Sequence, residues 1–327
     1  MMKRRTLIGT LAPLLAVPGT RAQSRNKTWR VGYLVLNRLT EPPSAERAAF
    51  LAALRELGYS IGANLAIEYR SADLDREQLP FRADELVQAK VDVIVVNSAD
   101  AARAALDATK TVPIIMLGVG DPVAFGLATS LARPEANLTG SSWQSIDLNG
   151  KRLQLLKEAL PRATRLAYLW NPESVAGNAS YASAREAAGK NGFVLDELRV
   201  TNAQDLQRAI QTLERRRPDA LYAHLDSRIA PYRQIIAEAA LRLKIPSMSG
   251  LRGYVEAGGL MSYAANQTEL YRRGASYVDR VLKGARPGDL PIEQPTRFEL
   301  VINLKTAKAL GIVIPGSLRL RADELIE

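Results

Sequence analysis

The feature that most constrains this chain is a regular alternation of short apolar runs with longer amphipathic segments. In the first half, RVGYLVL (30–36) and VDVIVVN (91–97) are apolar at nearly every position. Such runs are typical of parallel strands that are covered on both faces. Between them, SAERAAFLAALRELG (44–58) has the spacing of an amphipathic helix, and Ser44 is a suitable residue to cap its start.

The same alternation begins again after LTGSSW (138–143). Its strand candidates include RLAYLWN (165–171), ALYAHLD (220–226) and GLMSYAA (259–265), and helical patterns separate most of them. Parallel neighbours need a crossover connection, so alternating strands and helices predict an α/β lobe. Two successive sets therefore predict two doubly wound parallel-sheet lobes with a cleft between them.

The predicted lobe boundaries divide the chain after the leader into four parts. We expect lobe 1 over residues 29–141 and lobe 2 over residues 142–263, with 264–290 returning to lobe 1 and 291–327 lying near the hinge and lobe 2. The Pro- and Gly-rich stretch KGARPGDLPIEQP (283–295) is typical of a surface connection.

The first 22 residues differ from the rest of the chain. Three basic residues precede an uncharged stretch (6–20), and residues 20–22 resemble a small-x-small cleavage site. This pattern predicts a signal peptide over residues 1–22, and its apolar part is too short to span a bilayer. The chain has no cysteine, so it offers neither a lipid-anchor cysteine nor a disulfide. We therefore expect a soluble, exported, periplasmic protein, with either the general or the twin-arginine export route open.

The formal charge of +10 does not by itself indicate nucleic-acid binding. Four basic residues leave with the predicted leader, so the mature chain carries about +6. The densest basic run, Arg215 to Arg217, ends a helical pattern, where cations offset the helix dipole. We expect no nucleic-acid partner.

Ligands of open α/β sheets bind beyond the carboxyl ends of the strands. That rule, together with the polar residues at strand ends, predicts where this chain would contact a small molecule. The predicted contact residues are Asn37, Asn97, Ser98, Gly118, Gly120, Asp121, Asn171, His224, Asp226, Ser249 and Tyr263. Aromatic residues near strand ends, such as Tyr33 and Trp143, could add a surface for a ligand ring.

The glycine pair in MLGVGDPVAFG (116–126) does not match a phosphate-binding loop. A dinucleotide fingerprint needs a third glycine where Val123 stands, and no Gly-Lys-Ser/Thr follows. A tight turn is the plainer interpretation, with Asp121 capping a following helix and Pro122 in its first turn. Free amides at such a helix start also attract a carboxylate, so the loop remains a candidate wall of the site.

His224, the only histidine, and Asp226 are the residues closest to a catalytic pattern. A triad would need a serine partner, and the sequence has no G-x-S-x-G elbow. Without cysteines or a second histidine no metal site is expected, and we expect no cofactor. Asp226 could accept hydrogen bonds from a ligand ammonium group, or it could cap the helical segment IAPYRQ that follows.

Long stretches of the mature chain resemble a known family. They include LAALRELGYSIGANLAIEYRSADLDREQLP, VDVIVVNSADAARAALDAT, VPIIMLGVGDPV, SLARPEANLTG, KRLQLLKEALP, GGLMSYAAN, ELYRRGASYVDRVLKGARPGDLP and EQPTRFELVINLKTAKALGIVIP. In this order they resemble the ABC-transporter substrate-binding proteins related to tryptophan- and tyrosine-type uptake receptors.

The resemblance implies a type I periplasmic binding protein fold, with two hinged lobes that close on a solute and present it to a membrane permease. It also implies a cleft formed by loops around Asn97, Ser98, Gly120, Asp121 and the segment 224–226. An aromatic amino acid is the leading candidate ligand, and a monomer is expected. One departure from the family pattern is Asn97-Ser98-Ala99-Asp100, where relatives often have a glycine- or threonine-rich loop; the acid could alter how a ligand carboxylate is received.

Two other classes of protein compete with this interpretation. An exported α/β enzyme would use His224, Asp226 or Asp121 as acid or base. A sugar-repressor-like regulator would need an N-terminal helix-turn-helix, and the leader occupies that place. The predicted function is a solute receptor, which needs no catalytic set.

Overall fold

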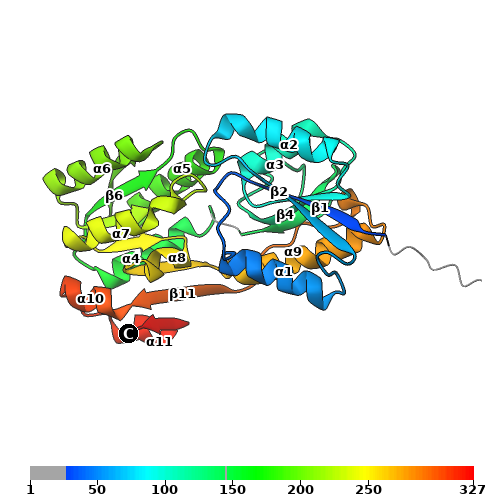
Figure 1. Ribbon diagram of the computed structural model, residues 1–327. Helices are drawn as coiled ribbons and strands as arrows, with labels where there is room; N and C mark the ends of the chain where they lie inside the picture. The colour runs from blue at the N-terminus through cyan, green and yellow to red at the C-terminus, as the bar shows by residue number, and fades with distance from the viewer. Residues whose placement is uncertain (1–26, 144–145) are drawn as a thin grey trace, which may run out of the picture.

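The computed structural model describes residues 27–143 and 146–327. The predicted leader, residues 1–22, lies outside the described residues. Figure 1 shows two α/β lobes side by side, each with helices on both faces of a central sheet. The predicted fold class is therefore confirmed, and the reasons lie in how each strand buries its side chains.

The sheet of lobe 1 is parallel throughout. Its strands, in spatial order, are β2 (Leu65–Ser71), β1 (Trp29–Val35), β3 (Val93–Val96), β4 (Ile114–Val119) and β5 (Leu138–Ser142). Helices α1 (Ala45–Glu56) and α9 (Gln267–Leu282) pack together on one face, and α2 (Leu79–Gln88) and α3 (Ala99–Ala108) cover the other.

The continuous apolar character of β3 follows from this double cover. Val93 and Val95 belong to the core beneath α1 and α9, while Ile94 and Val96 belong to the core beneath α2 and α3. Because successive side chains of a strand point to opposite faces, both sets must be apolar. Ser44 caps α1 as predicted, since its hydroxyl accepts from the backbone N–H of Arg47.

The sheet of lobe 2 is parallel except at one junction, where β11 runs antiparallel to β10. Its strands, in spatial order, are β12 (Glu324–Ile326), β11 (Phe298–Asn303), β10 (Met261–Ala265), β9 (Ser247–Ser249), β8 (Ala220–Ala223), β6 (Arg165–Trp170) and β7 (Val194–Arg199). Its helices are α4 (Asn149–Ala159), α5 (Val175–Lys190), α6 (Ala203–Arg216), α7 (Arg233–Arg242), α8 (Arg252–Glu256), α10 (Leu304–Leu310) and α11 (Gly316–Arg321).

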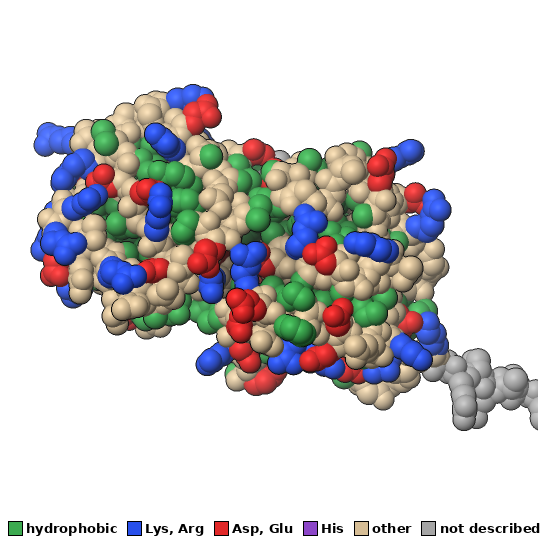
Figure 2. Space-filling view, turned by 90° about the horizontal axis from the view of Figure 1, so that it is seen from above, with side chains coloured by type: hydrophobic (Ala, Val, Ile, Leu, Met, Phe, Trp, Pro, Cys, Tyr) green, Lys and Arg blue, Asp and Glu red, His purple; other side chains and the backbone are tan. Residues whose placement is uncertain are grey.

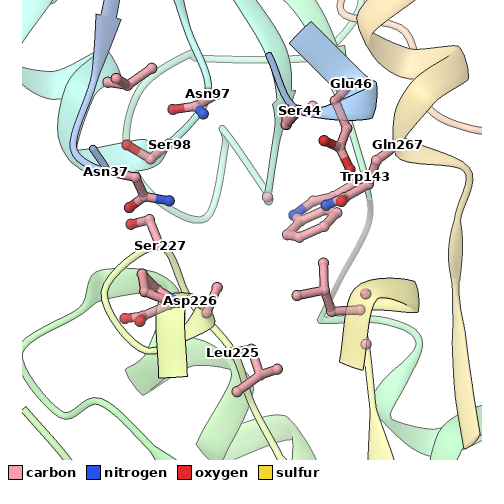
Figure 3. A pocket seen from close by; sticks show the side chains of 18 of the residues that line it. Asn37, Ser44, Glu46, Asn97, Ser98, Trp143, Leu225, Asp226, Ser227 and Gln267 are labelled. Carbon is pink, nitrogen blue, oxygen red and sulfur yellow. The ribbon is translucent and has the colours of Figure 1, made fainter. Parts of the chain in front are cut away.

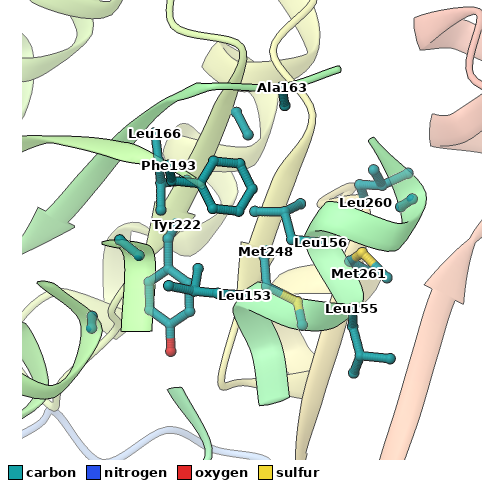
Figure 4. Packing of buried hydrophobic residues seen from close by; sticks show 14 of the residues in the cluster. Leu153, Leu155, Leu156, Ala163, Leu166, Phe193, Tyr222, Met248, Leu260 and Met261 are labelled. Atoms are coloured by element: carbon teal, nitrogen blue, oxygen red, sulfur yellow. The ribbon is translucent and has the colours of Figure 1, made fainter. Parts of the chain in front are cut away.

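Alternation along β6 also supplies two cores. Leu166, Tyr168 and Trp170 pack with α4 and α5, whereas Ala167 and Leu169 pack with α6 and α7. Figure 4 shows the first of these cores, in which leucines of α4 lie against Tyr222 and Met248 of neighbouring strands. Both lobes thus have a core of their own, as a pair of separate closing bodies requires.

The chain passes repeatedly between the lobes. It leaves lobe 1 after β5, returns to that lobe with α9, and leaves again toward β11. On the last passage the backbone of Glu293 bonds to β5, accepting from Ser142 N at 2.8 Å and donating to Gly140 O at 2.9 Å.

The expectation that residues 283–295 form a plain surface connection is wrong in part. Leu290 and Ile292 are buried in the two cores of lobe 1. Their side chains anchor a segment whose Pro and Gly content suggested solvent exposure, so composition missed two core residues there. The segment also contains the short 3-10 turn η3 (Pro287–Asp289).

Candidate functional site

A cleft of about 960 Å³ lies between the lobes. Residues beyond the carboxyl ends of β1, β3 and β4 line it from lobe 1, and residues beyond β8 and β9 line it from lobe 2. Figure 3 shows polar side chains from both lobes directed into this space. The cleft therefore lies where the ends of parallel strands place it.

Seven of the predicted contact residues line the cleft: Asn37, Asn97, Ser98, Gly118, Gly120, His224 and Asp226. Four do not, and they are Asp121, Asn171, Ser249 and Tyr263. The two groups differ because proximity to a strand end does not fix the direction of a side chain.

In lobe 1 the start of α3 forms one wall. Ser98 is the N-cap residue, and its hydroxyl oxygen accepts from Ala101 N at 3.2 Å. Asn97, the residue before the cap, hydrogen-bonds to Tyr271 of α9. Burial raises the pKa of Tyr271 to about 12, an effect that this bond opposes. The wall thus combines backbone N–H groups at a helix start with side chains that the packing holds in place.

Gly118 and Gly120 form the second wall of lobe 1. Gly118 has φ +67°, a conformation that other residues rarely adopt. At Gly120 a Cβ atom would lie 2.6 Å from Cε2 of Phe125 and 3.6 Å from Nε1 of Trp143, and both rings line the cleft. The absence of a side chain at residue 120 therefore lets these two rings occupy the wall.

The expected helix after Asp121 is wrong. Residues 121–126 form a turn, in which Phe125 N donates to Asp121 O at 3.0 Å. The Asp121 carboxylate still acts as a cap, because it accepts from Val123 N at 3.2 Å and Ala124 N at 3.1 Å. Its side chain serves the turn and does not line the cleft.

Asp226 provides the fixed carboxylate of lobe 2. One oxygen accepts from Arg228 N at 3.0 Å and Ile229 N at 2.9 Å, and the other accepts from Asn171 Nδ2 at 2.9 Å. The predicted capping role is confirmed for a turn, and the same residue also lines the cleft. Asn171 lies behind Asp226 and orients it.

His224 lines the cleft but is only 9% exposed. Burial lowers the pKa of His224 to about 4; nearby Asp226 works against this and Arg152 adds to it. The imidazole is therefore neutral at neutral pH. Its ring stacks on Tyr168 with centroids 6.3 Å apart, and within the described residues its Nε2 has no hydrogen-bond partner.

Ser249 is buried in lobe 2, and Tyr263 is partly buried against the core of the same lobe. The Ser249 hydroxyl donates to Ala223 O at 2.8 Å, and the Tyr263 ring packs against Phe298 with centroids 5.9 Å apart. The carbonyl of Tyr263 accepts from Nε of the buried Arg152 at 2.7 Å. The contacts of Ser249 and Tyr263 join neighbouring strands of the lobe 2 sheet.

Sequence reasoning missed several of the residues that line the cleft. Glu46 from α1 and Gln267 and Tyr271 from α9 line it together with Tyr33 and Trp143, whose position near strand ends did suggest such a role. The predicted return of residues 264–290 to lobe 1 was the signal that could have pointed to the start of α9.

Metal ligands and membrane spans are two further features that bear on the class of protein. Among residues 27–143 and 146–327, no group of three His, Cys, Asp or Glu side chains is placed to hold a metal ion. In the same part of the chain, no helix is long and apolar enough to cross a membrane.

Two parallel α/β lobes with a cleft at the ends of their strands define the type I periplasmic binding proteins. A family model described as ABC transporter substrate binding protein matches residues 41–326. The chain belongs to this family, and it is a substrate-binding protein of an ABC transporter.

Individual relatives agree with this assignment. The chain is 32% identical over 300 residues to a tyrosine-binding protein of Clostridioides difficile (strain R20291), covering 90% of this chain and 86% of that protein. A conserved domain protein of Vibrio cholerae has a similar structure, with a TM-score of 0.84, 29% identity, and coverage of 91% of this chain and 100% of that one. A Streptococcus pneumoniae ABC domain solved with L-Trp has the same fold, with a TM-score of 0.85, 24% identity, and coverage of 92% and 100%.

Proposed function

We propose that the cleft binds an aromatic α-amino acid, with L-tyrosine as the first candidate. The observation that carries this proposal is a cleft with two ends: Asp226 and the start of α3 lie at one, and Trp143, with Glu46 and Gln267 beside it, lies at the other. In Figure 3, Asn37, Ser98 and Asp226 lie toward one side and Trp143 toward the other. An amino acid with an aromatic side chain has the same two-ended character, and the name of the C. difficile relative supports tyrosine in particular.

The polar end has partners for both charged groups of an amino acid. The Asp226 carboxylate would accept from the ammonium group, as predicted. The Ser98 hydroxyl and the backbone N–H groups at the start of α3 would donate to the carboxylate, where the helix dipole also favours negative charge. Burying these charged ligand groups without partners would cost more than the about 1 to 3 kcal/mol of a neutral polar group, so their pairing provides specificity.

The aromatic end would hold the ring. Tyr33, Phe125, Trp143 and Tyr271 line the cleft, and ring pairs add about 0.5 to 1.5 kcal/mol beyond area burial. Glu46 lies at the same end, where its carboxylate could accept from a phenol O–H or an indole N–H.

Binding would act through lobe closure. A ligand that contacts both lobes stabilises the closed form over the open form and so shifts the population toward closure. The closed receptor would then deliver its solute to the membrane permease of the importer, a role that family membership implies. Export by the residue 1–22 leader, a periplasmic location and a monomeric state complete the proposal.

An exported enzyme is the weaker alternative. The only histidine is buried and neutral, with no serine hydrogen-bonded to its Nε2 in the described part of the chain. Nothing in this arrangement activates a nucleophile.

Calorimetry with L-tyrosine, L-tryptophan, L-phenylalanine and a set of aliphatic and acidic amino acids tests the proposal. We expect saturable binding of tyrosine with a 1:1 stoichiometry, accompanied by compaction in small-angle scattering. Absence of binding by every aromatic amino acid, or accumulation of a reaction product from any of them, would overturn it.

A further inference from the structure

An ionic cluster joins the two lobes at the edge of the cleft. Arg76, on the short 3-10 turn η1 (Arg76–Gln78), belongs to lobe 1. Its Nη2 lies 2.9 Å from Asp100 Oδ1 in the same lobe, and its Nη1 donates to the carbonyl of Glu173 in lobe 2 at 2.8 Å. Figure 2 shows acidic and basic side chains together at the junction of the lobes. Arg76 therefore makes a direct hydrogen bond across the interlobe boundary.

The lobe 2 side of this contact is coupled to the cleft. Glu173 forms an ion pair with Arg228, and its backbone N–H donates to Asn171 Oδ1 at 3.0 Å. The amide group of the same Asn171 donates to Asp226 at 2.9 Å. One short segment thus positions both the carbonyl that Arg76 reaches and the carboxylate that faces the ligand.

The cluster has an excess of negative charge. Three carboxylates, Asp100, Glu173 and Asp226, face two guanidinium groups, Arg76 and Arg228. The Asp100 side chain is only 14% exposed. Burial raises the pKa of Asp100 and the Asp226 carboxylate raises it further, while Arg76 and Arg228 oppose the rise. Because Asp100 and Asp226 both line the cleft from opposite lobes, closure brings like charges together where the ligand sits.

We propose that Arg76, held in place by Asp100, locks the cleft shut through its hydrogen bond to the Glu173 carbonyl, and that an ammonium-bearing ligand completes the lock by supplying the positive charge the cluster lacks. The inference rests on the proposed function and adds two residues to it. Asp226 binds the ammonium group from lobe 2, Asp100 faces that group from lobe 1, and Arg76 fastens the closed form through Glu173. The receptor accordingly selects solutes with a free amino group.

A purely local role for Asp100 makes a different prediction. An acid in the first turn of α3 stabilises the helix through its dipole. In that case neutralising Asp100 would change the stability of the protein without changing which ligands it prefers. Ligand preference is therefore the readout that separates the two roles.

Arg76→Gln tests the lock. L-Tyrosine is the probe, and stopped-flow tryptophan fluorescence follows its binding and release, since Trp143 lines the cleft. We expect the dissociation rate to rise about fivefold with little change in the association rate, because Arg76 is 39% exposed and its charged bonds are partly screened. Arg82→Gln is the matched control, because Arg82 pairs with Glu85 inside lobe 1 and is similarly exposed at 36%.

Lobe separation gives a second measurement with the same variants. The chain has no native cysteine, so cysteines introduced at Asp84 on α2 and Arg185 on α5 can carry spin labels without background. With saturating tyrosine, the label distances should broaden toward the open form in Arg76→Gln but not in Arg82→Gln. Unchanged release and unchanged distances in Arg76→Gln would overturn the lock, as would equal effects of the two variants.

Asp100→Asn tests the role of charge. The measured quantity is the preference for L-tyrosine over its deaminated analogue, 3-(4-hydroxyphenyl)propanoate. We expect this preference to fall roughly tenfold in Asp100→Asn, a change that one lost charged contact can produce. It should stay within twofold in Asp107→Asn, which changes an exposed acid of the same helix.

The possible results distinguish a failure of this inference from a failure of the proposed function. If the wild-type protein binds no aromatic amino acid, the proposed function fails and the inference falls with it. If tyrosine binds but Asp100→Asn keeps the wild-type preference, only the inference fails. Should that variant not fold, the wild-type preference must decline as pH falls through the raised pKa of Asp100, since protonation removes the same charge beside Arg76, Asp226 and Arg228; a flat profile would overturn the proposal.

Discussion

Replacing Gly120 by alanine should damage the cleft through a single steric contact. The φ angle of Gly120 is not in the left-handed region, so the backbone accepts alanine without strain. The new methyl group, however, would lie 2.6 Å from Cε2 and 2.9 Å from Cζ of Phe125. These distances are far below van der Waals contact, so either the Phe125 ring or the loop must move.

The magnitude follows from where Phe125 is packed. Phe125 is 7% exposed and packs in the core beneath α2 and α3, so its ring has little room on that side and can retreat only toward the cleft that it lines. Overpacking a well-filled core costs about 1 to 3 kcal/mol. We expect Gly120→Ala to lower the free energy of unfolding by about 2 kcal/mol on this basis, and to weaken L-tyrosine binding roughly tenfold because the displaced ring lines the cleft.

Urea unfolding and calorimetry measure these two effects. Gly150→Ala is the control, because Gly150 lies on α4 and the methyl group of an alanine there would meet no atom within 4 Å. The free energy of unfolding of that variant should rise by roughly 0.5 to 1 kcal/mol, the usual advantage of alanine over glycine in a helix. Its tyrosine affinity should not change.

A double-mutant cycle with Phe125→Leu identifies the contact itself. In the Phe125→Leu background, Gly120→Ala should cost at most about 0.5 kcal/mol, because the shorter side chain no longer occupies the methyl position. An equal loss in both backgrounds would show that the damage does not arise from Phe125. No loss in either background would refute the packing argument altogether.

Three other perturbations have defined outcomes. Asp226→Asn should weaken tyrosine binding roughly 10- to 100-fold in calorimetry while keeping the turn, because an asparagine carbonyl can still accept the turn N–H groups, although the bond from Asn171 Nδ2 is lost; unchanged affinity would argue against an ammonium contact. His224, as the only histidine, should give one imidazole NMR titration with a midpoint near 4. The pKa of His224 in the folded protein lies below its unfolded value of about 6.5. Neutral His224 therefore stabilises the fold above about pH 6.5, and this contribution, of the order of 3 kcal/mol, is lost as pH falls from about 6.5 toward 4. His224→Gln should flatten the pH dependence of the unfolding free energy over that range. Glu46→Gln should reduce the preference for tyrosine over phenylalanine about tenfold, since a charged acceptor for the phenol is lost; an unchanged ratio would place the phenol elsewhere.

The sequence predicted the two lobes because the spacing of apolar residues along the chain indicates which faces of a strand or helix are buried. In β3 every side chain is apolar, since each belongs to one of two cores, and that pattern is readable before any fold is known. Positions at strand ends were equally readable, and Ser98, His224 and Asp226 reach the cleft for that reason.

The direction of individual side chains was not readable to the same degree. Asp121 stands next to a cleft-lining glycine, yet its carboxylate turns back to its own loop. Tyr263 does not line the cleft, because its ring packs against Phe298 of the neighbouring strand. Local choices of this kind depend on hydrogen-bond partners that lie outside the short pattern around each residue.

By itself, then, the sequence determined two α/β lobes, their order along the chain and the loops that would meet a ligand. Tertiary structure decided which distant segments complete the cleft, such as Tyr271 of α9, and which groups meet across it, such as Arg76 and the Glu173 carbonyl. The physical reason is the sequence distance over which each kind of interaction acts. Periodicity and capping act over a few residues, whereas contacts between lobes are set by the packing of whole bodies about a hinge, to which no local pattern corresponds.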